Sequence, residues 1–199
     1  MMIAFFGPDG TGKSTVADKL EKKLNSLDIN TYRYHWRPRF LPSLSKNDNM
    51  HFDVTRPDDL KPRSWLISCL IYIYFFCDFL LAYFMLFMHL KRKGAIIIYE
   101  RYFYDILFHP TRYRLKSINR LSLILVKLLP SPNINILLKG KPEIIYSRKP
   151  ELPIKEIKNQ LTKMEHNLPL LGETLIINAT QNDPLTIMEQ IYDYIYIST

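Results

Sequence analysis

The segment FFGPDGTGKST near the amino terminus carries residues suited to holding phosphate groups, in the spacing G-x-x-x-x-G-K-[ST]. Glycines let a backbone turn and aim its N–H groups at phosphate oxygens, while Lys13 can reach outer phosphates and the Ser14 hydroxyl can ligate Mg²⁺. The pattern predicts a loop for ATP, with a plain strand–turn–helix corner as the alternative. Its members would be Gly7, Asp9, Gly10, Thr11, Gly12, Lys13, Ser14 and Thr15.

Asp9 is an unusual residue for such a loop, because a carboxylate works against the binding of polyphosphate. We therefore expect its side chain to turn away from the phosphates and towards a second ligand. The alternative is a simple turn residue, since Pro-Asp-Gly is a common turn tripeptide.

The elements that must position this loop are a strand before it, at 2–6, and a helix after it, at 13–27. Further strands are expected at 30–36, 95–99, 133–138 and 174–179. An irregular segment at 37–63 follows the first of these strands. Helices are expected at 115–129, 142–148, 154–167 and 184–197. This alternation predicts an α/β fold, a three-layer doubly wound sheet of five parallel strands, in one domain spanning 1–199.

Charged residues follow the expected strands, at the edge of the sheet where such folds bind ligands. The positive side chains of this set would neutralise charge during phosphoryl transfer, although each could instead be a solvated surface charge. The set comprises His35, Arg37, Arg39, Glu100, Arg101, Lys139 and Lys141, with Arg148 and Lys149 on the next helix.

Glu100 is the acidic member of this set. It can hold a metal-bound water or accept a hydrogen bond from a substrate, and a salt bridge to a nearby base is the alternative. The histidines and cysteines show no zinc-ligand spacing, and no nucleophile motif is visible. We therefore expect direct transfer without a covalent enzyme intermediate.

Residues 65–90 form a long apolar stretch with one charged side chain, Asp78. The stretch is long enough to span a bilayer, but the strands before and after it should share one sheet, so we expect a helix packed on that sheet. At helical spacing, Ser68, Tyr72, Tyr74, Asp78, Tyr83 and His89 share the half expected to be wetter. The other half, expected to cover the core, holds Leu66, Cys69, Leu70, Ile73, Phe76, Leu80, Phe84, Phe87 and Met88.

Two roles follow for this helix. Asp78 would lie beside an acceptor pocket, or make a helix–helix hydrogen bond. The surplus apolar surface predicts a homodimer interface, with peripheral membrane contact, helped by Arg63, Lys91, Arg92 and Lys93 at its ends, as the alternative.

Composition limits the partners and the compartment. A net charge of +8 favours an anionic ligand, and the basic residues suit phosphates in one cleft better than nucleic acid. Cys69 and Cys77 would lie about 12 Å apart along one helix, too far for a disulfide, which favours a reducing, cytoplasmic location.

With GPDGTGKST and YERYFYDILFHPTRYR, the chain resembles the thymidylate-kinase-like branch of the P-loop nucleoside and nucleotide kinases. The resemblance implies that Asp9 contacts the acceptor sugar, Arg101 holds the acceptor phosphate, and Glu100 acts near Mg²⁺ or the acceptor. SRKPEL resembles a lid segment within 141–168, so Arg148 would close over the phosphates, and NATQNDP would border adenine.

The chain also departs from thymidylate kinases, which have a Glu-Pro pair where this chain has HWRPRF. It is closer to a subgroup that shares HWRP and the RYFYDIL run, some of whose members lie among polysaccharide-synthesis genes. We therefore expect an ATP- and Mg²⁺-dependent kinase of a nucleoside monophosphate or similar small acceptor. The alternatives are a sugar or lipid-linked acceptor, or a nucleotide-binding regulator without turnover. The expected catalytic residues are Lys13, Arg101 and Arg148. The acceptor is expected to contact Asp9, Arg37, Asp78, Glu100 and Arg101, and the metal ion to be bound by Ser14 and Glu100.

Overall fold

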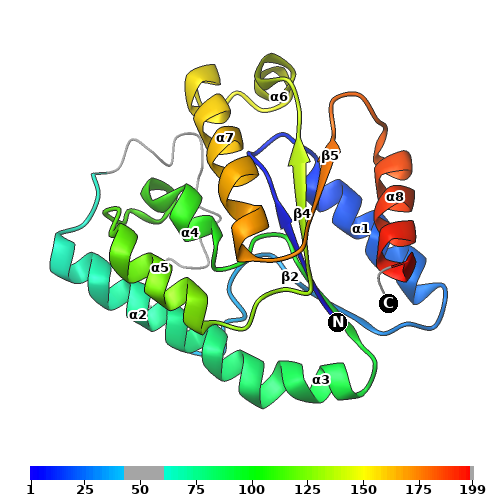
Figure 1. The fold of residues 1–199 in the computed structure, drawn as a ribbon, viewed down its shortest axis with the longest axis horizontal. Coiled ribbons are helices and arrows are strands. Elements are labelled where there is room, and N and C mark those ends of the chain that lie inside the picture. The colour runs from blue at the N-terminus through cyan, green and yellow to red at the C-terminus, as the bar shows by residue number, and fades with distance from the viewer. Residues whose placement is uncertain (43–60, 198–199) are drawn as a thin grey trace.

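A computed structural model describes residues 1–42 and 61–197, which form a five-stranded parallel sheet of order β2-β3-β1-β4-β5 (Figure 1). The strands are β1 (Met2–Phe6), β2 (Thr31–Tyr34), β3 (Ile96–Tyr99), β4 (Ile134–Lys139) and β5 (Thr174–Asn178). In the centre of the sheet, Ala4 of β1 aligns with Tyr99 of β3 on one side and Asn135 of β4 on the other. The predicted five-stranded α/β sheet is therefore confirmed.

The sheet is covered by helices on both faces, because the side chains of its central strand are apolar in both directions. Met2, Ala4 and Phe6 of β1 belong to one core, whereas Ile3 and Phe5 belong to the other. Helices α1 (Lys13–Asn25) and α8 (Pro184–Ile197) cover the second core, on the right in Figure 1. The first core is covered by α2 (Trp65–Ala82), α5 (Asn119–Leu128) and α7 (Ile154–Leu171), on the left.

Shorter elements complete the described chain. They are a π-helix (Tyr83–Phe87) and α3 (Met88–Arg92), which continue α2, then α4 (Asp105–Phe108), a 3₁₀-helix (Pro110–Tyr113) and α6 (Pro142–Arg148). The sequence did not predict α4 or the 3₁₀-helix, since four residues are too few to show helical periodicity. Most of the irregular segment expected at 37–63, namely residues 43–60, lies outside the part of the chain that the structure describes.

In the long helix, the side that carries Ser68, Tyr72 and Asp78 faces the protein interior, whereas the sequence predicted that this side would face water. Ser68 and Asp78 have no exposed surface and Tyr72 is almost fully buried, whereas Leu66 and Leu70 are each 68% exposed. The prediction that the polar half is the wetter one was therefore wrong. Its physical reason is that the inner polar groups find specific partners in the rest of the chain.

Asp78 shows how these partners work. Arg37 donates from Nε to Asp78 Oδ2 at 2.8 Å, and the Leu41 backbone N–H donates to Asp78 Oδ1 at 2.5 Å. A buried carboxylate needs such compensation, because an unpaired charge in the interior is strongly unfavourable. The chain that follows β2 is thereby fixed near the carboxyl end of α2.

The helical run Trp65–Arg92 is long and apolar enough to cross a membrane by length and composition alone. The most apolar 18-residue window of this run has a mean hydropathy of 2.1, and 33% of that window is buried. Strands β2 and β3, which precede and follow it, pair in parallel with Tyr34 opposite Tyr99. Phe79 and Phe87 of this run pack on Tyr99 of the sheet. The fold therefore packs the inner side of the helix against the sheet.

Candidate functional site

The glycine loop lies between β1 and α1, where the motif predicts it. Gly7, Gly10 and Gly12 have φ values of +137°, +91° and +88°, in the region that favours glycine. A Cβ on Gly7 would lie 2.4 Å from the Leu138 carbonyl oxygen, and one on Gly10 would lie 2.7 Å from that of Ile145. The loop is therefore packed tightly between β4 and α6, and any side chain at these two positions would push its neighbours away.

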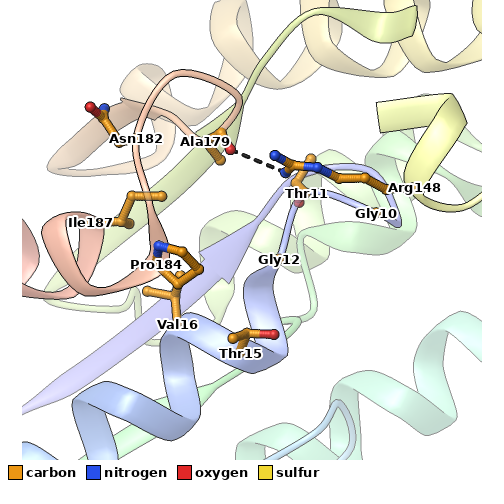
Figure 2. A pocket seen from close by; sticks show the side chains of 10 residues that line it. All are labelled: Gly10, Thr11, Gly12, Thr15, Val16, Arg148, Ala179, Asn182, Pro184 and Ile187. Atoms are coloured by element: carbon orange, nitrogen blue, oxygen red, sulfur yellow. Dashed lines mark hydrogen bonds between the residues drawn. The ribbon is translucent and has the colours of Figure 1, made fainter. Parts of the chain in front are cut away.

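A pocket of about 230 Å³ opens beside this loop (Figure 2). One wall is formed by the loop and the start of α1, including Gly12 and Thr15, and the other by the turn from β5 to α8, including Ala179 and Asn182. Arg148, from the last turn of α6, reaches across and donates to the Ala179 carbonyl oxygen at 3.1 Å. A ligand in this pocket would touch both the loop and Arg148.

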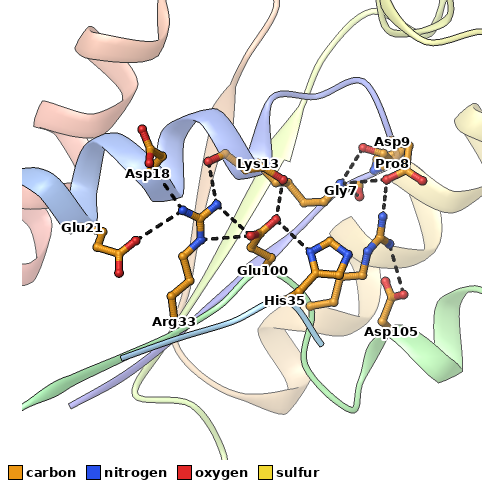
Figure 3. A network of polar contacts seen from close by, with 12 residues as sticks. Gly7, Pro8, Asp9, Lys13, Asp18, Glu21, Arg33, His35, Glu100 and Asp105 are labelled. Carbon is orange, nitrogen blue, oxygen red and sulfur yellow. Dashed lines mark hydrogen bonds and ion pairs between the residues drawn. The ribbon is translucent and has the colours of Figure 1, made fainter. Parts of the chain in front are cut away.

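Lys13 folds back over the loop (Figure 3). Its Nζ donates to the carbonyl oxygens of Gly7, at 2.7 Å, and Pro8, at 2.8 Å, and lies 3.6 Å from Asp9 Oδ1. Burial and the nearby Arg101 guanidinium lower the pKa of Lys13 to about 7, although Asp9 acts in the opposite direction. The charge of Lys13 is therefore poorly compensated inside the protein.

Asp9 and Arg101 belong to a second group of charges, which we call the arginine cluster: Asp9, Arg101, Asp105, Arg112 and Tyr113. Asp9 accepts hydrogen bonds from Arg101 Nη2 and, at 2.6 Å, from Arg112 Nη1. Asp105 Oδ2 in turn lies 3.3 Å from Arg101 Nη1 and accepts from the Tyr113 hydroxyl at 2.7 Å. Short helices α4 and Pro110–Tyr113 bring Asp105, Arg112 and Tyr113 to this place.

The prediction placed Asp9 and Arg101 in the site but missed Arg112, Asp105 and Tyr113. The run YERYFYDILFHPTRYR contains all three, so the signal was present. What the sequence did not reveal is the pair of short helices that folds the run back onto the loop.

The charges of Lys13 and the arginine cluster do not balance. Lys13, Arg101 and Arg112 are three cations, whereas Asp9 and Asp105 are two carboxylates. Burial raises the pKa of Asp9, but Arg101, Lys13 and Arg112 outweigh it and hold that pKa well below its usual range. Two carboxylates therefore serve three cationic side chains, and a bound anion would balance the excess positive charge.

Glu100, at the end of β3, is the centre of another cluster (Figure 3). The Ser14 hydroxyl donates to Glu100 Oε2, Arg33 Nη2 lies 2.7 Å from Oε1, and His35 Nδ1 lies 3.2 Å from Oε2. Burial raises the pKa of Glu100, but the hydrogen bonds of His35 and Ser14 and the charge of Arg33 lower it to about 2. Glu100 is therefore ionised at neutral pH. Arg33, which also lies 3.3 Å from Glu21, was not predicted.

The same cluster has the donor atoms that Mg²⁺ prefers, namely a carboxylate and a hydroxyl oxygen, next to the glycine loop. Within 1–42 and 61–197, no group of three or more His, Cys, Asp or Glu side chains could enclose a metal ion. Because Mg²⁺ usually completes its shell with water and substrate phosphates, Ser14 and Glu100 suffice as protein ligands.

Other predicted residues lie apart from these clusters. Arg37 and Asp78 pair with each other, so their predicted contact with an acceptor stays a prediction. Lys139 Nζ lies 2.7 Å from Glu165, and Lys149 lies 2.9 Å from Glu151. Among the predicted basic residues, Arg101 contacts the glycine loop at Asp9, and Arg148 lines the pocket.

The chain matches no protein-family model and no curated protein sequence. Its sheet order, with the glycine loop after β1, is consistent with a P-loop-like Rossmannoid fold. The loop, the pocket and the two charge clusters are therefore the basis on which a function can be assigned.

Proposed function

We propose that this chain is an ATP- and Mg²⁺-dependent phosphotransferase that moves the γ-phosphoryl group to a small phosphorylated acceptor such as a nucleoside monophosphate. The observation that carries the proposal is the unbalanced positive charge of Lys13, Arg101 and Arg112 at the glycine loop. Phosphoryl transfer is catalysed mainly by positioning the reactants and neutralising charge, which is what these residues are able to do.

On the donor side, the loop N–H groups and Lys13 would hold the ATP phosphates, and the pocket beside them would take the rest of the nucleotide. Lys13 would then exchange its contacts with the Gly7 and Pro8 carbonyl oxygens for phosphate oxygens. Arg148 would neutralise charge on the transferred group from the lid side. Ser14 and Glu100 would hold Mg²⁺, which would supply Lewis-acid stabilisation of the phosphate charge.

On the acceptor side, Arg101 and Arg112 would bind the phosphate of the acceptor, because guanidinium groups match phosphate oxygens in pairs. The resemblance to thymidylate-kinase-like enzymes supports this assignment for Arg101. Both carboxylate oxygens of Asp9 already accept hydrogen bonds from arginines. An acceptor sugar that reaches Asp9 would therefore have to displace one of them, so in our proposal Asp9 chiefly positions Arg101 and Arg112.

A second candidate is a kinase for a lipid-linked or sugar phosphate acceptor. The observation that favours it is the exposed apolar surface of the long helix, where Leu66 and Leu70 are each 68% exposed. A protein that meets its acceptor at a membrane would have a use for such a surface.

The test is ADP release from ATP and Mg²⁺ by the full chain, measured with a panel of nucleoside monophosphates, sugar phosphates and lipid-linked phosphates. Release that one nucleotide class stimulates would support the first candidate, and release stimulated only by sugar or lipid-linked phosphates would support the second. Tight ATP binding without stimulation by any acceptor would overturn both and indicate a nucleotide-binding regulator.

Glu100→Gln is expected to raise the Mg²⁺ concentration needed for half-maximal activity by about tenfold or more, while changing the KM for the acceptor little. The reason is that Ser14, the loop's metal ligand, donates its hydroxyl hydrogen bond directly to the Glu100 carboxylate. The measurement is a Mg²⁺ titration of turnover at saturating acceptor.

The matched control is Glu21→Gln, because Glu21 also pairs with Arg33, at 3.3 Å, and no contact joins it to Ser14 in the described structure. This variant should keep the Mg²⁺ dependence of the unmodified protein. If Glu100→Gln raised only the KM for the acceptor, Glu100 would act on the acceptor and not on the metal ion.

A further inference from the structure

The outer side of the long helix is an apolar surface that the described chain leaves uncovered. Between 38% and 68% of the surface of each of six residues is exposed there: Leu66, Leu70, Ile73, Leu81, Phe84 and Met85. Trp65, at the start of the helix, is also more than half exposed. Monomeric proteins rarely leave this much contiguous apolar surface in water, so a surface of this kind usually meets a partner.

A neighbouring helix extends this surface. Helix α5 packs beside α2, and its Leu123, Ile124 and Leu128 are 44%, 57% and 62% exposed (Figure 1). None of these residues lines the pocket or belongs to the clusters around Asp9 and Glu100. We call the exposed apolar residues of α2, the π-helix and α5 the outer face.

Within the segment that carries the outer face, residues 61–131, the exposed charged side chains have a single sign. Residues 61–131, all of which the structure describes, contain eleven Lys and Arg and three Asp and Glu, a net charge of +8. This equals the net charge of the whole chain, so the remaining residues are neutral overall. The three acidic residues, Asp78, Glu100 and Asp105, are all buried. The surface of this segment is therefore apolar and basic, without an exposed carboxylate.

The basic residues stand at the borders of the outer face. Lys91, Arg92 and Lys93 follow the apolar part of the long helix, while Arg120 and Lys127 lie on α5. An apolar centre flanked by Lys and Arg is the pattern of helices that lie in the interface of a membrane containing anionic lipid. The aromatic ring of Trp65 suits the same environment, since Trp is enriched at the headgroup level.

A second copy of the chain fits this surface less well. A two-fold dimer places the same face of each copy opposite the other, so the basic residues of both would approach each other without carboxylates to pair with. Like charges held together in this way disfavour association. A membrane span is also disfavoured, because Asp78 on the inner side of the helix is paired with Arg37 within the protein.

We propose that the outer face binds the surface of membranes that contain anionic lipid, with α2 and α5 lying in the plane of the interface. The apolar side chains enter the headgroup and upper acyl region, while Lys91, Arg92, Lys93, Arg120 and Lys127 contact lipid phosphates. The glycine loop and its pocket take no part in this contact. The proposal holds for any activity of the nucleotide site.

The experiment is cosedimentation of the full chain with vesicles of phosphatidylcholine alone or with about 30 mol % phosphatidylserine. The expected result is at least roughly tenfold stronger binding to the anionic vesicles, reversed by raising the salt concentration from about 0.1 M to about 0.5 M. Equal binding to both vesicles, or binding to neither, would overturn the proposal.

Two variants test the apolar and basic parts separately. L70E combined with F84E places carboxylates in the outer face at positions where folding does not require burial, and it should abolish vesicle binding. Charge reversal of Lys91, Arg92 and Lys93 to Glu should reduce binding to anionic vesicles by at least roughly tenfold.

Matched controls come from elsewhere on the surface. L170E combined with L185E changes two residues that are 74% and 55% exposed on α7 and α8, and it should bind vesicles like the unmodified chain. Reversal of Lys155, Lys158 and Lys163, exposed on α7, is the control for charge. Equal losses in test and control variants would mean that the outer face is not the binding surface.

Light scattering of the protein without lipid tests whether a second copy of the chain covers the outer face. A monomer is expected in the absence of lipid. A discrete dimer that L70E combined with F84E dissociates would overturn the proposal and assign the outer face to a second copy.

Discussion

Lys13→Met is expected to reduce phosphoryl transfer by at least roughly 10²–10³-fold while raising the melting temperature of the ligand-free protein by several degrees. The activity falls because the variant lacks the ammonium group that reaches the outer phosphates. The stability rises because Lys13 is a buried cation with an incompletely compensated charge, and its removal leaves two cations facing two carboxylates. The measurements are ADP release and thermal unfolding without nucleotide.

The gain in stability should depend on pH. In the folded, ligand-free protein the pKa of Lys13 is about 7, below the 10.5 of an exposed lysine. Below pH 7 the residue is charged in both states and its burial is unfavourable. Between pH 7 and 10.5 the folded protein has released the proton that the unfolded chain keeps, so the unmodified protein gains stability. The advantage of Lys13→Met should therefore be largest at or below pH 7 and should shrink as the pH rises.

Lys22→Met is the matched control, because Lys22 lies on the same helix with 75% of its side chain exposed. This variant should keep its activity and change the free energy of unfolding by at most about 0.5 kcal/mol. If Lys13→Met instead lowered the melting temperature, Lys13 would be a structural counter-ion of Asp9 rather than a charge that awaits an anion.

Asp9→Asn is expected to have the opposite effect on stability and to lower the melting temperature by on the order of 10 °C. Asp9 accepts hydrogen bonds from Arg101 and Arg112 and lies 3.6 Å from Lys13. Its loss leaves these three cations, two of them buried, with Asp105 as the remaining carboxylate. Removing one partner from a buried ion pair typically destabilises a protein by about 3–5 kcal/mol. Thermal unfolding at neutral pH measures the change.

Inorganic sulfate provides a second readout. It should raise the melting temperature of Asp9→Asn by more than that of the unmodified protein, because an anion bound near Arg101 and Arg112 replaces the missing charge. Asp18→Asn is the control, since Asp18 makes an exposed pair with Lys22 on the same helix. An Asp9→Asn variant as stable as this control would show that Asp9 is a turn residue without a role in charge compensation.

The sequence was sufficient to predict the sheet and the loop, because both depend on local patterns. Apolar runs of five residues mark strands such as Met2–Phe6, and the glycine spacing marks the loop that follows. Helix α6 was predicted with its correct bounds, since Pro142 suits the first turn of a helix. Helix α7 extends four residues beyond its expected end, through Pro169.

Contacts between segments far apart in the chain could not be predicted from the sequence. Hydrophobic periodicity assumes that polar residues face water, and α2 violates that assumption because Arg37 and Leu41 bind the buried Asp78. Arg112 was overlooked for a related reason. Its place beside Asp9, 103 positions away, depends on two short helices that carry no periodic signal.

The contact between Gly10 and the Ile145 carbonyl oxygen has a mechanical consequence. Helix α6 rests directly on the loop backbone, since the space that a Cβ of Gly10 would need is occupied by α6. The backbones of the loop and of the helix that carries Arg148 are therefore in close contact. If the proposed function holds, phosphates that reshape the loop would also displace α6 and Arg148, so the binding of ATP would be transmitted through the backbone to the side chain that closes over it.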